Sequence, residues 1–314
     1  MGPVCAVSVD LDPLGCYYGI HGLGAAPAEL SDVVLRRGLP RFLELFARRR
    51  LAATFFVVGE DLDEGVGTAA GREALRAAVA AGHELGNHTH HHRYELTRLD
   101  PEAIGREIDG AHQRIAEVAG APPVGFRAPG YNINAALMSA VAARGYRYDS
   151  SLLPAPAYYG AKAAVMAAMG LAGRRSQSVL GDPRQLWSSR LPYRPDEQSP
   201  WRRGHARLVE LPITVTPSLR LPVIGTPVVT APALVRRLLL GAVRGLPFFN
   251  FELHGIDLCD AAEDGLPDAL KARRPELKVP LARRLQALED TLDRLADAFR
   301  FAPLREVAEE FQEA

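Results

Sequence analysis

Cysteine is scarce in this sequence. Its three cysteines, Cys5, Cys16 and Cys259, lie far apart and form no Cys-x-x-Cys pair. Sparse cysteines of odd number are typical of proteins that keep their thiols reduced, so no disulfide framework is expected. The sequence also lacks any apolar run of about 18 residues, which argues against a membrane span.

Neither sign of charge dominates the chain. Lys and Arg together number 37, and Asp and Glu together also number 37. Without a global positive field, nucleic acid is not an expected partner. The first residues, MGPVCAVSVDLD, show no basic segment followed by an apolar one, so we expect no secretory signal and a cytoplasmic location. These features leave open a transient contact with a membrane surface and a homo-oligomer.

Short apolar runs alternate with amphipathic segments along the chain. Ile104, Ile108, Ala111 and Ile115, for example, recur at helical spacing between two apolar runs. Strand, helix and strand in repetition predict parallel strands joined by helical crossovers. The strand-like runs cover residues 4–9, 53–58, 84–88, 124–127, 146–149, 208–213 and 248–253.

Polar residues stand near the carboxyl ends of several predicted strands. An open doubly wound sheet would spread them along one edge, whereas a barrel would bring them to one mouth. We therefore favour a single α/β barrel domain over residues 1–314, with a long insertion at about 155–207 that interrupts the alternation. The polar strand-end residues are Asp10, Asp12, His88, Arg127, Asp149 and His254.

The strongest candidate for chemistry is the segment GNHTHHH, from Gly86 to His92. If a helical turn follows the strand here, His88 and His92 lie on one face and could share a metal ion. The alternative is a surface histidine cluster or a cloning tag, but a tag would sit at a terminus. A metal held by two imidazoles also needs an anionic oxygen. Asp10 and Asp12 are two apart in a strand and point the same way, although such a pair can also be a turn or a helix cap.

Two further segments carry candidate residues. In GFRAPGY, Arg127 ends a strand, Pro129 stiffens the turn, and Gly130 allows backbone to approach a ligand closely. The alternative is a simple tight turn. In FELH, His254 ends a late strand, where a lone histidine is more often structural than catalytic.

Together these segments resemble the NodB-homology polysaccharide deacetylases, carbohydrate esterase family four. That family carries an Asp-containing first motif, then H-[ST]-x-x-H, R-x-P and a late L-x-H, in this order; the resemblance runs from Val4 to His254. It implies a distorted, seven-stranded (β/α) barrel. Many members have adjacent aspartates, whereas here Leu11 separates Asp10 from Asp12. The family's D-x-x-x-x-D-W motif has no clear match, so the partner of His254 is unassigned.

The resemblance also implies roles for individual residues. It assigns one divalent metal ion, most often zinc, to Asp12, His88 and His92. Asp10 corresponds to the catalytic base. The remaining assignments are Thr89 as the residue that steadies the histidine loop, Arg127 as the arginine that orients the base, His254 as the general acid, and a backbone N–H near Gly130 or Tyr131 as the oxyanion donor.

The implied function is a metal-dependent hydrolase that removes an acetyl group from an N-acetylated amino sugar or a related carbohydrate precursor. One alternative is a deformylase or cyclic-amide hydrolase on the same scaffold, and another is a sugar-binding protein without turnover. Between positions 174 and 207 of the insertion, the sequence has eight arginines and only three acidic residues. We therefore hypothesise a partly mobile lid in which Trp187, Arg202 and Arg203 bind a phosphorylated sugar.

Overall fold

A single parallel sheet forms the centre of the computed structural model, which describes residues 2–313. The strand order is β6-β5-β4-β3-β2-β1-β7, with β8 paired to the first residues of β1. Every strand pair is parallel, as the strand and helix alternation predicts. The strands are β1 (Val4–Asp10), β2 (Thr54–Val57), β3 (Glu84–Asn87), β4 (Gly125–Phe126), β5 (Tyr148–Asp149), β6 (Val209–Glu210), β7 (Phe248–His254) and β8 (Arg300–Phe301).

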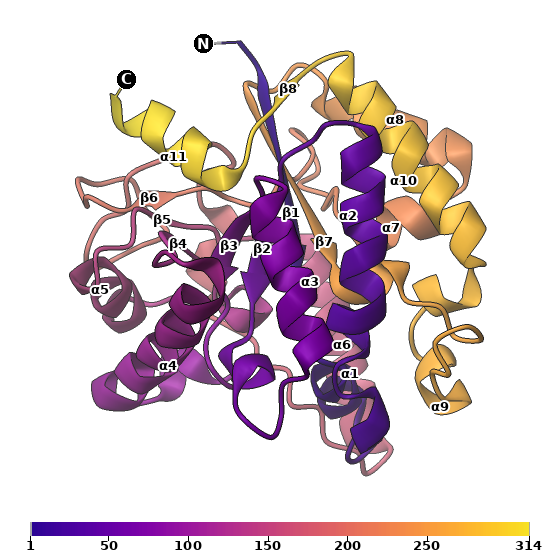
Figure 1. Cartoon of the computed structure of the whole chain (residues 1–314). Helices are drawn as coiled ribbons and strands as arrows, with labels where there is room; N and C mark the ends of the chain where they lie inside the picture. Colours follow the sequence, from indigo (N-terminus) through magenta and orange to yellow (C-terminus); the bar gives the residue numbers. More distant parts are fainter. Residues whose placement is uncertain (1, 314) are drawn as a thin grey trace.

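Helices surround this sheet and connect its strands (Figure 1). Helices α2, α3, α4 and α5 each precede the next strand of the sheet, which confirms the predicted crossovers. No helix within residues 2–313 is both long and apolar enough to cross a membrane. The helices are α1 (Leu14–His21), α2 (Leu39–Arg48), α3 (Ala69–Ala80), α4 (Pro101–Ala119), α5 (Ala135–Ala143), α6 (Pro156–Leu171), α7 (Gly225–Thr230), α8 (Ala233–Val243), α9 (Asp268–Lys271), α10 (Leu281–Ala296) and α11 (Leu304–Glu313).

Strand β1 lies between β2 and β7 and is buried along its whole length. Strands covered on both faces read as continuous apolar runs, which explains the sequence VCAVSVD. Its one interior polar residue, Ser8, donates a hydrogen bond to Asn250 on β7. The parallel register of β1 and β7 sets Asp10 beside His254. Strand pairing alone therefore makes these two candidate catalytic residues neighbours.

The sheet curls but does not close by strand pairing between β6 and β7. Instead, the segment after β6 reaches β7 through two hydrogen bonds: Thr214 N donates to the Asn250 carbonyl at 3.2 Å, and Asn250 N donates to Thr214 Oγ1 at 2.7 Å. Seven strands thus form a curled half-barrel, which confirms the predicted distorted (β/α) barrel.

The region of the predicted insertion, residues 155–207, contains one long helix and then mostly irregular chain. Helix α6 follows β5, and a short 3₁₀ turn at Pro183–Trp187 follows later. Figure 1 places α6 beside α1 at the end of the sheet where β1 ends. The insertion therefore contributes a helix to the mouth of the half-barrel.

Candidate metal centre

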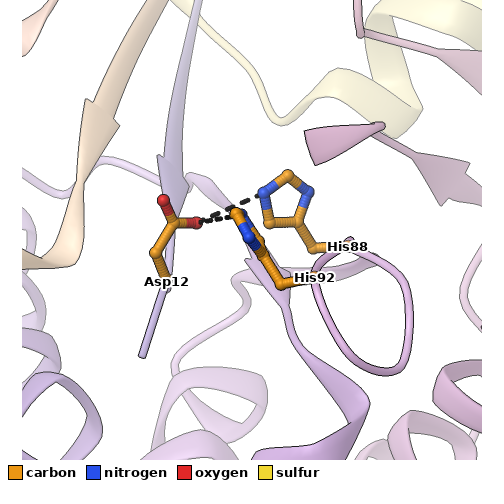
Figure 2. Close-up of side chains that lie close together, drawn as sticks. All are labelled: Asp12, His88 and His92. Atoms are coloured by element: carbon orange, nitrogen blue, oxygen red, sulfur yellow. Dashed lines mark ion pairs between the residues drawn. The ribbon is translucent and has the colours of Figure 1, made fainter. Parts of the chain in front are cut away.

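Asp12, His88 and His92 converge at the mouth of the half-barrel (Figure 2). Asp12 lies just beyond β1, and the two histidines lie on the loop that follows β3. Oδ1 of Asp12 is 3.3 Å from Nε2 of His88 and 3.2 Å from Nε2 of His92. All three side chains are buried. The structure therefore brings together the three predicted metal ligands.

The loop that carries the histidines differs from the predicted helical turn. After β3 the chain bends without forming a helix, and Thr89 and His92 adopt left-handed φ values of 67° and 51°. Side chains fix this bend: Asn87 Oδ1 accepts a hydrogen bond from Thr89 N at 2.8 Å, and Thr89 Oγ1 accepts one from His92 N at 3.1 Å. The expectation of a helical face was wrong because these side-chain contacts replace the helical ones.

A cation fits the donor set of this cluster. The Nδ1 atom of His88 lies 2.7 Å from the carbonyl oxygen of Arg127, which selects the tautomer whose Nε2 is free to bind a metal. Oδ1 of Asp12 is buried and receives no hydrogen bond. An anionic oxygen beside two imidazole nitrogens, with no donor of its own, suits zinc and several other divalent ions.

The electrostatics of the cluster favour positive charge. Burial opposes ionisation of Asp12, but His92 and His88 overcome this effect and hold its pKa well below the usual range. Burial likewise opposes protonation of His92, yet Cys16 and Asp12 raise its pKa to about 10. A bound divalent cation would supply the same compensation for the Asp12 carboxylate.

Arg127 anchors Asp10 beside the cluster. Its Nη1 donates a hydrogen bond to Asp10 Oδ1 at 2.5 Å, and its Nε donates to the Ser150 carbonyl at 2.7 Å. Its Nη2 donates to Ser8 Oγ at 3.0 Å and to Ser150 Oγ at 2.8 Å. The fully buried guanidinium also stacks on the ring of Phe56, 4.2 Å from the centroid. Asp10 is therefore held in one orientation, with its other oxygen 3.8 Å from Nε2 of His88.

Glu252 is a site residue that the sequence reasoning missed. Its Oε1 lies 3.5 Å from Nε2 of His254 and accepts a hydrogen bond from the Tyr131 hydroxyl at 2.7 Å. Burial raises the pKa of Glu252 to about 7. Burial opposes protonation of His254, but Glu252 and the nearby aspartates raise its pKa to about 9. The two-residue spacing within β7, which puts both side chains on one face, was the available signal.

Asp10, Glu252 and His254 form a second cluster of potential ligand atoms. Here the Arg127 guanidinium already compensates the charge of Asp10, and the Tyr131 hydroxyl binds Glu252. This arrangement suits proton transfer better than the binding of a second cation. The cluster faces the Asp12 site, because Nε2 of His254 lies 3.9 Å from Oδ2 of Asp12.

The Pro129–Tyr131 turn borders the site as predicted for a backbone that approaches a ligand. Gly130 and Tyr131 both have left-handed φ values, of 68° and 66°. A Cβ on Gly130 would lie only 2.9 Å from Cδ1 of Tyr94, so a side chain at this position would clash.

A cavity of about 430 Å³ lies over these groups. Beyond the candidate catalytic residues, its wall is formed by α1, α6, the segment around Ile224, and Arg273 and Arg274. Trp187, Arg202 and Arg203, predicted to contact substrate, are not among its lining residues. Trp187 is 70% exposed and stacks against Arg220 instead.

Comparisons with known proteins agree with this architecture. The family model for "Polysaccharide deacetylase" matches residues 31–148. The chain is 26% identical over 153 residues to a peptidoglycan deacetylase of Helicobacter pylori, covering 47% of this chain and 49% of the relative. It is 35% identical over 91 residues to a chitooligosaccharide deacetylase of Bradyrhizobium sp., covering 29% and 38% of the two chains. The chain thus spans about half the length, or less, of these curated relatives.

A solved structure from Mycobacterium smegmatis, described provisionally as a polysaccharide deacetylase, covers 99% of this chain and 91% of its own, with a TM-score of 0.60 and 20% identity. This likeness shows a shared fold. The curled parallel half-barrel is the NodB-type fold. Residues 31–148 of this chain match the polysaccharide deacetylase family.

Proposed function

We propose that this chain is a metal-dependent hydrolase that removes the acetyl group from an N-acetylated amino sugar or a related carbohydrate precursor. One observation carries the proposal: the buried Asp12 oxygen faces two imidazoles, with Asp10 and His254 at hand in the same cavity. The names of the curated relatives, peptidoglycan and chitooligosaccharide deacetylases, support an N-acetylated carbohydrate as substrate.

Each candidate residue has a task in amide hydrolysis. Asp12, His88 and His92 would hold a divalent ion, most often zinc, which polarises the amide carbonyl and makes water more acidic. Asp10 accepts the proton of the attacking water. Arg127 keeps that carboxylate oriented through their 2.5 Å hydrogen bond.

The second half of the reaction needs a proton donor for the departing amine. His254 lies at the cavity, where Glu252 and the nearby aspartates raise its pKa to about 9 against the effect of burial, so its ring is placed to carry and deliver that proton. Glu252 holds the charged ring in place. Backbone N–H groups of the Gly130–Tyr131 turn would stabilise the tetrahedral oxyanion.

The test is a panel of N-acetyl, N-formyl and cyclic-amide substrates, incubated with protein reconstituted with zinc. We expect acetate release from N-acetyl sugars and much less turnover of the other two classes. Preferred formate release would favour a deformylase, and ring opening would favour a cyclic-amide hydrolase. Sugar binding without turnover, by protein shown to contain metal, would indicate a binding protein and contradict the proposal.

A further inference from the structure

Helix α6 is an apolar helix that the fold leaves largely uncovered. Its sixteen residues, PAYYGAKAAVMAAMGL, contain one charged residue, Lys162, and no acid. Only Tyr159 and Met169 are buried, whereas Val165 is 56% exposed and Leu171 is 93% exposed. A surface helix usually presents polar side chains to water, so this composition indicates a further contact surface.

The position of α6 links it to the active-site cavity. Tyr158, Lys162, Val165 and Met166 line the cavity. The exposed residues Ala164, Ala168 and Leu171 do not line it. The helix therefore forms one wall of the cavity while its outer side faces away from the protein at the same end of the molecule (Figure 1).

Basic residues surround this end of the cavity. From residue 150 to residue 181 the sequence has no Asp or Glu, but has Lys162, Arg174 and Arg175. Arg174 donates a hydrogen bond to the carbonyl of His21, which lines the cavity. Arg174 and Arg175 therefore lie beside the cavity. Arg273 is exposed and also lines the cavity, on the segment of Arg273 to Pro275. Among the acids of residues 263–278, Glu276 is buried against Arg274, and Glu263 and Asp264 pair with Arg41. Exposed Asp268 is near exposed Lys271 and Lys278 in the sequence.

We infer that α6 and these basic residues dock the chain on an anionic lipid bilayer, and that the cavity receives a substrate carried on a lipid anchor in that bilayer. The inference of a lipid-anchored substrate rests on the function proposed above. Sixteen residues span about 24 Å, less than the roughly 30 Å hydrocarbon core, so the helix lies in the interface plane.

The charge pattern favours a lipid surface over a second copy of the chain. A two-fold contact through parallel copies of α6 would bring Arg174 and Arg175 of one copy close to the same residues of the other, and their like charges repel. An antiparallel contact would set these arginines against the start of the partner's α6, in a segment that has no Asp or Glu from residue 150 to residue 181. Anionic head groups complement those arginines, and acyl chains cover Val165 and Leu171. The lipid surface thus satisfies both the apolar and the basic parts of the patch.

Binding to vesicles tests the docking surface without any assay of activity. Wild-type protein should float with vesicles of equal parts phosphatidylglycerol and phosphatidylcholine, should bind pure phosphatidylcholine much less, and should release as salt is raised. The double variant Ala168→Glu, Leu171→Glu should lose at least about tenfold in partitioning, because it places charge where apolar surface meets the acyl chains.

Leu238→Glu is the matched control. Leu238 is 68% exposed on α8, which Figure 1 places at the other end of the molecule from α6. We expect this variant to bind vesicles as the wild type does. The inference is overturned if wild-type protein ignores anionic vesicles, or if Leu238→Glu loses binding while the α6 double variant keeps it. It is also overturned if sedimentation shows a dimer that the α6 double variant dissociates.

The inference of a lipid-anchored substrate is tested separately, by enzyme kinetics. A soluble N-acetylated oligosaccharide and a lipid-anchored N-acetyl sugar in anionic vesicles are compared as substrates. The α6 double variant should keep its kcat/KM on the soluble substrate and lose about tenfold on the anchored one. Equal loss on both contradicts the inference alone, whereas wild-type protein that hydrolyses neither, although it binds vesicles, contradicts the proposed function.

Discussion

The carboxylate of Glu252 lies 3.5 Å from Nε2 of His254, and both side chains point from β7 into the same site. The Tyr131 hydroxyl donates a hydrogen bond to the same carboxylate oxygen at 2.7 Å. This pair supplies the partner of His254 that the sequence motifs left unassigned. Under the proposed function, it places a proton donor beside Asp12, His88 and His92.

Glu252→Gln should lower kcat for an N-acetyl substrate by about 10–100-fold, because His254 loses the anion that orients its charged ring. The loss should shrink on an acetyl ester with a nitrophenol leaving group, since that group departs without a proton. Steady-state kinetics on the two substrates measure the difference. An equal loss on both would show that Glu252 supports the structure of the site and not proton delivery.

Asp10→Asn should keep the metal and lose about 10²–10⁴-fold in kcat, the usual worth of a general base. Asp12→Asn should lose the metal, because its Oδ1 is the anionic oxygen between the histidines. Elemental analysis and kinetics of the two variants check this. The opposite result would mean that the two aspartates exchange roles.

Removal of either metal histidine should abolish metal binding. We expect His92→Ala protein to retain little zinc after dialysis, with His91→Ala as the control. His91 is half exposed and pairs with Glu107, away from the cluster. Full zinc occupancy in His92→Ala, measured by elemental analysis, would disprove this ligand set.

Arg127→Lys should destabilise the fold by about 2–3 kcal/mol, because a buried ammonium cannot replace the planar fork that serves Asp10, Ser8 and Ser150. Arg144→Lys is the control, since the Arg144–Asp109 pair is partly exposed and should contribute less than about 1 kcal/mol. Urea denaturation measures both. Similar losses in the two variants would contradict the anchoring role.

The buried carboxyls of Glu210 and Asp149 should contribute a loss of stability as pH rises above about 5. Burial raises the pKa of Glu210 well above its usual value, and burial also raises that of neighbouring Asp149. The folded state then holds protons that the unfolded chain releases near its ordinary pKa, about 4, so rising pH favours unfolding until the folded pKa is passed. Glu210→Gln should flatten this slope between pH 5 and 8, whereas exposed Glu197→Gln should not. If stability depends on pH in both variants as it does in the wild type, the proposed contribution of Glu210 is contradicted.

Local patterns predicted the parallel half-barrel and the three side chains, Asp12, His88 and His92, that meet at its mouth. The alternation of apolar runs and amphipathic segments predicted the parallel half-barrel, since a strand buried on both faces must be apolar. His88 and His92 are close in sequence and on one loop, so their spacing was informative even though the loop is not helical. Asp12 could be added because the carboxyl ends of parallel strands meet at one mouth.

Contacts between distant segments could not be predicted in the same way. Arg273 and Arg274 line the cavity although they follow the last motif, and their place depends on how the chain packs after β7. The arginines of the insertion were chosen by composition, but Arg202 and Arg203 lie outside the cavity lining, and α6 forms the wall instead. The composition of the insertion does not show which of its residues line the cavity, because that depends on how the insertion packs against the rest of the chain.

The left-handed bend at Thr89 and His92 has a thermodynamic consequence. Such backbone conformations cost on the order of 1–2 kcal/mol for each residue that is not glycine, and here the Asn87 and Thr89 hydrogen bonds hold them. The chain's own side chains therefore help to order the histidine loop. Chelation should then leave a folded apoprotein with an empty, rigid site, so that one preparation can be reloaded with zinc, cobalt or manganese and compared ion by ion.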